Sequence, residues 1–180
     1  MSIVLVGSTS GSITLQEPAV SGSTVLSLPA VTGTILTTTS PKAGNVIQVV
    51  GATQATQTST TSTSYVDTGL TATITPTSSS SKILVIYSAQ FRRSTGDVSN
   101  GVNVILVRGS TQIQKAAGYG GFTNTSIFQT WNVASSYVDS PATTSATTYK
   151  VQFSSTISGQ QAVYLTDGAE GYITLMEIAA

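Results

Sequence analysis

A series of short apolar runs, separated by turn residues, constrains the fold of this chain more than any other feature. The runs are rich in Val, Ile, Leu and Tyr, and no stretch keeps a helical period over a useful length. Runs of this kind, bounded by Gly, Pro, Asn, Asp and Ser, predict an all-β sandwich or jelly roll. The predicted strands are 45–50, 63–66, 70–75, 82–92, 102–108, 111–117, 126–136, 147–155 and 171–179, with a weaker one at 161–165.

The chain is unusually rich in Ser and Thr, which at first sight conflicts with a folded β-sandwich. The sequence contains 27 Ser and 31 Thr in 180 residues, and low-complexity Ser/Thr tracts are typical of disordered chains. Disorder also requires low hydrophobicity and high net charge, whereas here 39% of residues are hydrophobic and the net charge is zero. The hydroxyls therefore fit the water-facing side of strands.

Missing residue types exclude several functions. The chain has no His and no Cys, which removes Cys/His zinc sites, Ser–His or Cys nucleophiles and imidazole acid/base chemistry. Seven basic and seven acidic residues give no basic face for nucleic acid. We expect no enzyme and no cofactor, because most carboxylates lie beside turn residues. They are Glu17, Asp67, Asp97, Asp139, Asp167, Glu170 and Glu177.

Two turns with several oxygen ligands leave calcium as an alternative to ordinary turns, since Ca²⁺ binds oxygen. These are residues 97–103 and 167–170, and neither matches an EF-hand loop. Ordinary turns are the preferred interpretation, so no metal site is predicted.

Residues 1–43 differ from the rest of the chain because glycine recurs there every 11 residues. Gly11, Gly22, Gly33 and Gly44 mark the repeat, and short alternating apolar runs lie between them. A fixed period indicates a repeated unit, here one turn and one short strand. Such units cannot bury a core alone, so they either pack on the following domain or meet copies of themselves, and a three-fold β-bundle with other copies is favoured over a flexible linker. We therefore predict two parts, a repeat segment at 1–43 and a sandwich at 44–180.

The first apolar run suits attachment to another protein. Ile3, Val4, Leu5 and Val6 could form an exposed edge strand that adds to a strand of a partner.

Two predicted strands are apolar on both sides. In 102–108 the residues Val104 and Leu106 alternate with Ile105 and Val107, and in 171–179 Met176 and Ile178 face away from the odd-numbered apolar residues. Burial inside the monomer and burial against a neighbouring subunit both explain this pattern.

A glycine-rich loop is the candidate ligand or receptor site. Tyr119 and Phe122 lie among glycines and Asn124 follows, and such aromatic residues are common at interfaces. Packing of these rings beneath the loop or at a subunit contact is the alternative. Trp131 lies inside a predicted strand and is expected in the core, while Arg92-Arg93 could begin a loop and pair with Asp97.

Several blocks of the sequence resemble a known family. The blocks are GSITLQEPAV at 11–20, TVLSLPAVTGTILTTT at 24–39, GNVIQVV at 44–50, TTSTSYVDTGLTATITPT at 60–77, SSKILV at 80–85 and LVRGST at 106–111. They are similar to tail-fibre-like and other virion surface structural proteins of marine and cyanobacterial phages. The resemblance implies a homotrimeric phage structural protein with a β-sandwich head.

The length of the chain leaves no room for a long fibre shaft. The expected function is a trimeric capsid decoration (cement) protein or a short fibre or spike, with recognition of host surface glycans as the alternative. Expected partners are copies of itself and capsid or tail proteins, without nucleic acid or membrane insertion. The sequence begins without a secretory signal, so the virion, assembled in the host cytoplasm, is the expected location.

Overall fold

The computed structural model describes residues 2–6, 12–16, 42–94, 99–123 and 127–180. The chain divides into two compact units, Met1–Ile35 and Leu36–Ala180. We call the second unit the head domain. The described part of the chain contains no helix that could span a membrane.

The first unit contains a two-stranded antiparallel hairpin. Strand β1 (Ser2–Val6) pairs with β2 (Ser12–Gln16), so that Ile3 faces Leu15 and Leu5 faces Ile13 across the pair. The predicted attachment strand therefore has a partner along one edge. Gly11, Gly22 and Gly33 lie outside the described residues, and Gly44, at the fourth position of the repeat, lies within the head domain.

The described residues of the head domain form ten strands, all in antiparallel pairs. Their bounds are β3 (Val46–Gln54), β4 (Thr58–Thr60), β5 (Val66–Ile74), β6 (Lys82–Arg93), β7 (Asn100–Arg108), β8 (Thr111–Thr123), β9 (Gln129–Asp139), β10 (Thr147–Ser155), β11 (Ala162–Tyr164) and β12 (Gly171–Ile178).

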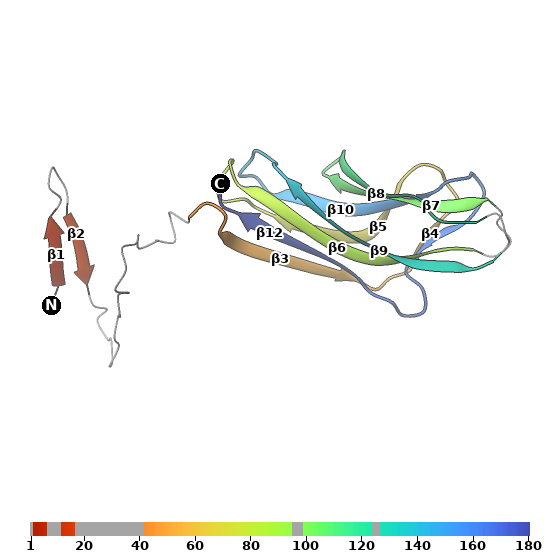
Figure 1. Ribbon diagram of the computed structural model, residues 1–180, viewed down its shortest axis with the longest axis horizontal. Coiled ribbons are helices and arrows are strands. Elements are labelled where there is room, and N and C mark those ends of the chain that lie inside the picture. Colours follow the sequence, from red (N-terminus) through yellow and green to blue (C-terminus); the bar gives the residue numbers. More distant parts are fainter. Residues whose placement is uncertain (1, 7–11, 17–41, 95–98, 124–126) are drawn as a thin grey trace. The chain divides into compact units, whose positions relative to one another are not determined.

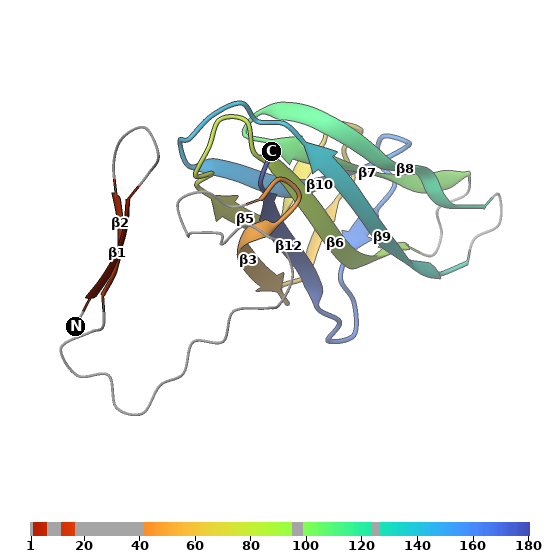
Figure 2. The same cartoon turned by 60° about the vertical axis from the view of Figure 1, so that its left-hand side comes forward.

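These strands form two sheets packed face to face, which confirms the predicted β-sandwich (Figures 1 and 2). The order in one sheet is β5-β10-β7-β8. In the other, β3-β12-β6-β9 lie side by side, and β11 and β4 continue beyond the end of β12 along β6. We call them the β5 sheet and the β6 sheet.

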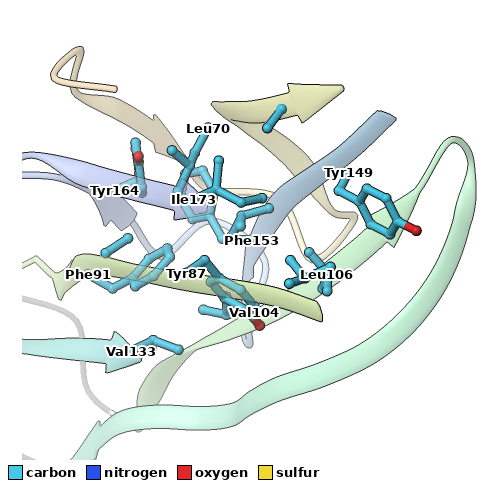
Figure 3. Close-up of a cluster of buried hydrophobic side chains, with 14 of the residues drawn as sticks. Leu70, Tyr87, Phe91, Val104, Leu106, Val133, Tyr149, Phe153, Tyr164 and Ile173 are labelled. Carbon is cyan, nitrogen blue, oxygen red and sulfur yellow. The ribbon is translucent and has the colours of Figure 1, made fainter. Parts of the chain in front are cut away.

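The core lies between the sheets and follows from period-two alternation. Along β5 the inward residues Leu70, Ala72 and Ile74 are buried while their neighbours are exposed. Aromatic rings fill the middle, where Phe91 lies 5.9 Å from Phe153 and 5.6 Å from Tyr164 between ring centroids (Figure 3). Tilted contacts at these distances are favourable beyond the apolar area they bury.

One predicted turn is a strand irregularity instead. Residues 67–69 lie inside β5, where the pairing with β10 shifts register between Lys150 and Gln152, and Gly69 has a φ of 86°. A glycine tolerates this conformation within a β-bulge, so the strand continues through it. The predicted strand at 63–66 is largely wrong, and the short strand β4 lies just before it.

Burial inside the monomer accounts for the two-sided strand at 102–108. It is β7, a central strand between β10 and β8. Ile105 and Val107, on the side away from the core, are each only 3% exposed. No neighbouring subunit is needed to bury them.

Glu177 is a buried carboxylate that ties three segments together at one end of the β6 sheet. Its Oε1 accepts hydrogen bonds from the Thr77 backbone nitrogen and hydroxyl, both at 2.7 Å, and its Oε2 accepts one from Gln48 at 2.5 Å. Burial acts to raise the pKa of Glu177, but the hydrogen bonds from Gln48, Ser81 and Thr77 together outweigh it and hold this pKa below its usual value.

We expect this carboxylate to make the head domain acid-sensitive. A lowered pKa in the folded state adds stability above the unfolded value of 4.5, and this stability is lost as pH falls through the folded value. Glu177→Gln should lower the free energy of unfolding at pH 7 by about 2 kcal/mol. Urea denaturation from pH 7 to pH 3 tests this, and an unchanged slope against pH in the variant would contradict it.

Buried tyrosines predict a second loss of stability, at alkaline pH. Burial raises the pKa of Tyr87 to about 12 and also raises the pKa of Tyr164 above its usual value of 10.0. Because the folded state holds these protons more tightly, stability should fall as pH rises above the unfolded value. Absorbance at 295 nm and circular dichroism should change together, and Tyr164→Phe should flatten the decline. Ionisation without unfolding would refute the prediction.

Candidate functional site

The head domain has two distinct ends. Residues 42–46 and the C-terminus lie together at one end, where the Gly44 nitrogen donates to the Ala179 oxygen at 2.8 Å. The last residues of β8 and the first residues of β9 lie at the opposite end (Figure 1). We call these the proximal end and the distal end.

Four large apolar side chains are exposed at the distal end, and we call them the aromatic tip. Tyr119 is 60% exposed and Phe122 is 49% exposed, and Ile127 and Phe128 on the other side of the connection are similarly open. The Tyr119 and Phe122 rings meet edge to face, with centroids 5.8 Å apart. The guanidinium of Arg92 lies 5.0 Å from the centre of the Phe128 ring. Exposed groups of this size mark binding surfaces.

Glycines allow the backbone of β8 to lie directly on a tryptophan. Trp131 points inward from β9, and a Cβ on Gly120 would lie 2.9 Å from its Cζ2 and Nε1 atoms. A Cβ on Gly121 would overlap the same ring. The strand is irregular here, with positive φ at Tyr119 (57°) and Gly121 (62°) and shifts in its register with β7. The irregularity directs Tyr119 and Phe122 toward solvent.

A side chain of β7 supports this irregular backbone. Asn103 Oδ1 accepts a hydrogen bond from the Tyr119 nitrogen at 3.3 Å, and Asn103 Nδ2 donates to the Ser154 hydroxyl at 3.3 Å. A non-glycine residue at positive φ is strained, so its neighbours must hold it in place.

The structure brings together only part of the predicted ligand loop. Tyr119 and Phe122 are neighbours and neither ring packs beneath the loop, while Asn124 lies outside the described residues. Trp131 packs against the core as expected. Ile127 and Phe128 were missed, although two adjacent large apolar residues at a strand start cannot both face inward.

The predicted acidic residues occupy different environments. Arg92 and Arg93 end β6 rather than begin a loop, and Asp97 and Glu17 lie outside the described residues. Asp167 and Glu170 lie in the β11–β12 connection. Asp139 is not a turn residue with a solvated carboxylate, because it ends β9 with its side chain only 8% exposed.

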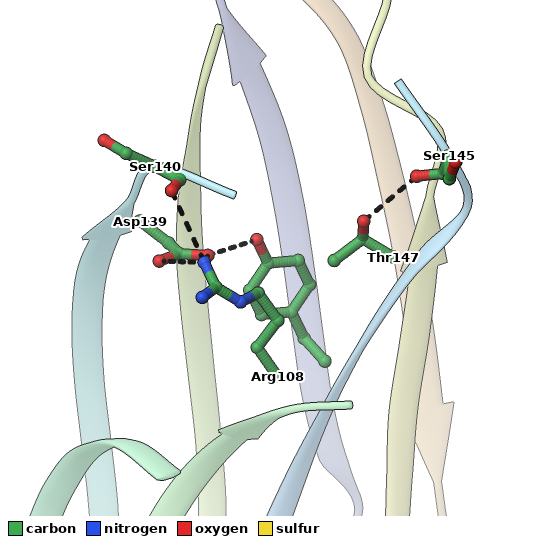
Figure 4. A network of polar contacts seen from close by, with 6 residues as sticks. Arg108, Asp139, Ser140, Ser145 and Thr147 are labelled. Atoms are coloured by element: carbon green, nitrogen blue, oxygen red, sulfur yellow. Dashed lines mark hydrogen bonds and ion pairs between the residues drawn. The ribbon is translucent and has the colours of Figure 1, made fainter. Parts of the chain in front are cut away.

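Asp139 is the centre of a polar cluster at the proximal end (Figure 4). Arg108 Nη1 donates to both of its oxygens, at 2.9 and 2.8 Å, and the Tyr149 hydroxyl donates to Oδ2 at 2.7 Å. Burial, together with the hydrogen bond to Asp139 and the charge of Asp139, raises the pKa of Tyr149. An open cavity of about 330 Å³ lies beside Arg108 and is lined by Thr143, Thr147 and Pro141 among others. The cluster links β7, β9 and β10.

Comparison with known proteins gives no family for this chain. No family model matches it, and no curated protein matches it. The chain is similar to solved structures of infectious bursal disease virus. One is a VP2 subviral particle, at 14% identity and TM-score 0.41, covering 74% of this chain and 37% of that chain. Another is the T13 viral particle, at 13% identity and TM-score 0.42, covering 94% and 42%.

This chain therefore spans less than half the length of the solved chains it matches.

Proposed function

We propose that this chain is a structural protein on the surface of a virus particle, resembling phage tail-fibre-like proteins. Residues 1–43 attach it to a capsid or tail protein, and the head domain projects outward as a short fibre or spike, in a homotrimer. The observation that carries this proposal is the exposed aromatic tip at the distal end, opposite the point where the leading segment enters the head domain.

The placement of the aromatic tip favours a projecting head over a decoration protein lying flat on a capsid. A segment attached at one end and a binding surface at the other can bridge a particle and an outside partner. The apolar rings reduce solubility, and a strained backbone at Tyr119 is maintained to present them. Both features are expected of a contact surface rather than of a packing defect.

Labelling of intact particles tests the proposal. The chain has no cysteine, so Tyr119→Cys creates a single thiol at the aromatic tip. We expect the chain in purified particles of the virus that encodes it, with this thiol reacting with biotin maleimide. Absence from particles would overturn the proposal. A thiol that reacts only after particle disruption would overturn the outward orientation, and particles that rupture without the protein would favour the decoration role.

The Tyr119–Phe122 pair also favours a second candidate, recognition of host surface glycans. An exposed aromatic ring with a polar edge can stack on the apolar face of a sugar. Binding on a glycan array should be lost in Tyr119→Ala and largely kept in Tyr119→Phe, because the second variant retains the ring. Equal binding by Tyr119→Ala, or no binding by the parent chain, would reject this candidate.

A further inference from the structure

The outer face of the β6 sheet carries a row of apolar side chains that crosses four strands. The pairing places Leu84 of β6 between Val138 of β9 and Met176 of β12, and Met176 beside Val49 of β3. We call these four residues the apolar row. Val49 is 56% exposed and Val138 is 52% exposed. Figure 2 shows the four strands side by side.

This face differs from the outward side of strand β5, at the edge of the other sheet. The exposed residues of β5 are Asp67, Gly69 and two threonines, Thr71 and Thr73, as expected of a strand side that meets water. On the β6 sheet, Val46 and Ile178 lie next to the apolar row and extend it toward the proximal end. Met176 and Ile178 face away from the core, as predicted. The core therefore does not cover these two side chains, and the surface that packs against them has to be identified.

We propose that the apolar row binds a second copy of this chain. The inference rests on the proposed function, because it names the surface through which copies assemble. Gly44, which follows residues 1–43, is held against the end of β12 by its hydrogen bond to Ala179, and the chain enters β3 at Val46, beside the row. Copies joined through their leading segments would therefore bring these rows close together.

Shape and charge favour the same partner. A shallow hollow of about 480 Å³ lies beside the row, lined by Ile86, Ala134, Ser136 and Tyr172 among others. It exists because the outward residues of β9 before the large Val138, Ala134 and Ser136, are small. The row of one copy can fill the hollow of the next, which makes the face self-complementary.

Electrostatics do not oppose this association. The chain has zero net charge, so copies do not repel one another through net charge. On the described outward positions of these four strands the charged residues are Lys82 and Arg92, at the two ends of β6. The middle of the face therefore buries no charge when two copies meet.

A matched pair of thiols tests this assignment in the full-length chain. Val138→Cys places a thiol in the apolar row, and Asn132→Cys places one at an exposed outward position of the same strand. Light scattering should show an oligomer, in which the Val138→Cys thiol reacts with maleimide about tenfold or more slowly than the Asn132→Cys thiol. Dilution to the monomer should make the two rates similar.

Three outcomes would overturn the proposal. The first is a chain that stays monomeric at about 100 µM. The second is an oligomer in which the Val138→Cys and Asn132→Cys thiols react with maleimide at equal rates. The third is a monomer in which the Val138→Cys thiol is protected, which would assign the face to residues 1–43 of the same chain. Val138→Lys should weaken association about a hundredfold, since it buries an unpaired charge, while Asn132→Lys should not. Protein that is absent from virus particles but still assembles through this row would refute only the proposed function.

Discussion

Asp139→Ala is expected to lower the free energy of unfolding of the head domain by about 3 kcal/mol. The substitution removes the acceptor of the Tyr149 hydroxyl and the ion-pair partner of Arg108 at once. The Tyr149 hydroxyl would be left without its acceptor, and Arg108, whose side chain is 31% exposed, would lose its counter-charge. Because the three residues belong to β10, β9 and β7, the loss should loosen the connection between the two sheets at the proximal end. Urea denaturation at pH 7 measures the effect.

Asp67→Ala is the matched control for this prediction. Asp67 also forms an ion pair with a strand residue, Lys150, at 3.0 Å, but its side chain is 54% exposed. Exposed pairs contribute at most about 1 kcal/mol, so this variant should stay close to the parent chain. Similar losses in both variants would show that burial of the Asp139 cluster adds no stability.

Period-two alternation explains why the strands of the head domain were predictable. Strand β10 has the predicted bounds because large apolar residues alternate with polar ones along it, and β6, which begins with a continuous apolar run from Ile83 to Tyr87, differs by one residue. The bulge in β5 was not predictable from Asp67-Thr68-Gly69. The same three residues fit a turn that ends a strand and a bulge through which the strand continues. Pairing with β10 decides between them.

The candidate site was predictable only where neighbours in sequence are also neighbours in space. Tyr119 and Phe122 lie three residues apart among glycines, and their contact follows from local geometry. Arg108 and Asp139 lie 31 residues apart, and their contact depends on which strands are adjacent. The sequence holds no signal for that order.

The apolar row depends on strand order in the same way. Met176 alone is one apolar residue on a water-facing side, which is ordinary for a protein surface. It becomes part of a surface because β12 lies between β3 and β6, and β9 lies beyond β6. The register then aligns Val49, Leu84 and Val138 with it.

Gly121→Ala should destabilise the distal end more than any other single-methyl change there. Gly121 combines a φ of 62° with a position against the Trp131 ring that leaves no space for a Cβ. The left-handed backbone costs an alanine about 1 kcal/mol, and forcing the strand off the ring adds about 1–3 kcal/mol. We expect a total loss of about 3 kcal/mol, together with faster hydrogen exchange at residues 119–123.

Gly109→Ala separates the two contributions. Gly109 has a nearly identical φ of 58°, as the first central position of the tight β7–β8 turn requires, and nothing lies within 4 Å of its would-be Cβ. This variant should lose only the backbone contribution of about 1 kcal/mol. The excess loss in Gly121→Ala should then disappear when Trp131→Ala is already present, because the ring that the methyl group meets is gone. If the excess persists in that background, contact with Trp131 does not explain the glycine, and the orientation of Tyr119 and Phe122 has another cause.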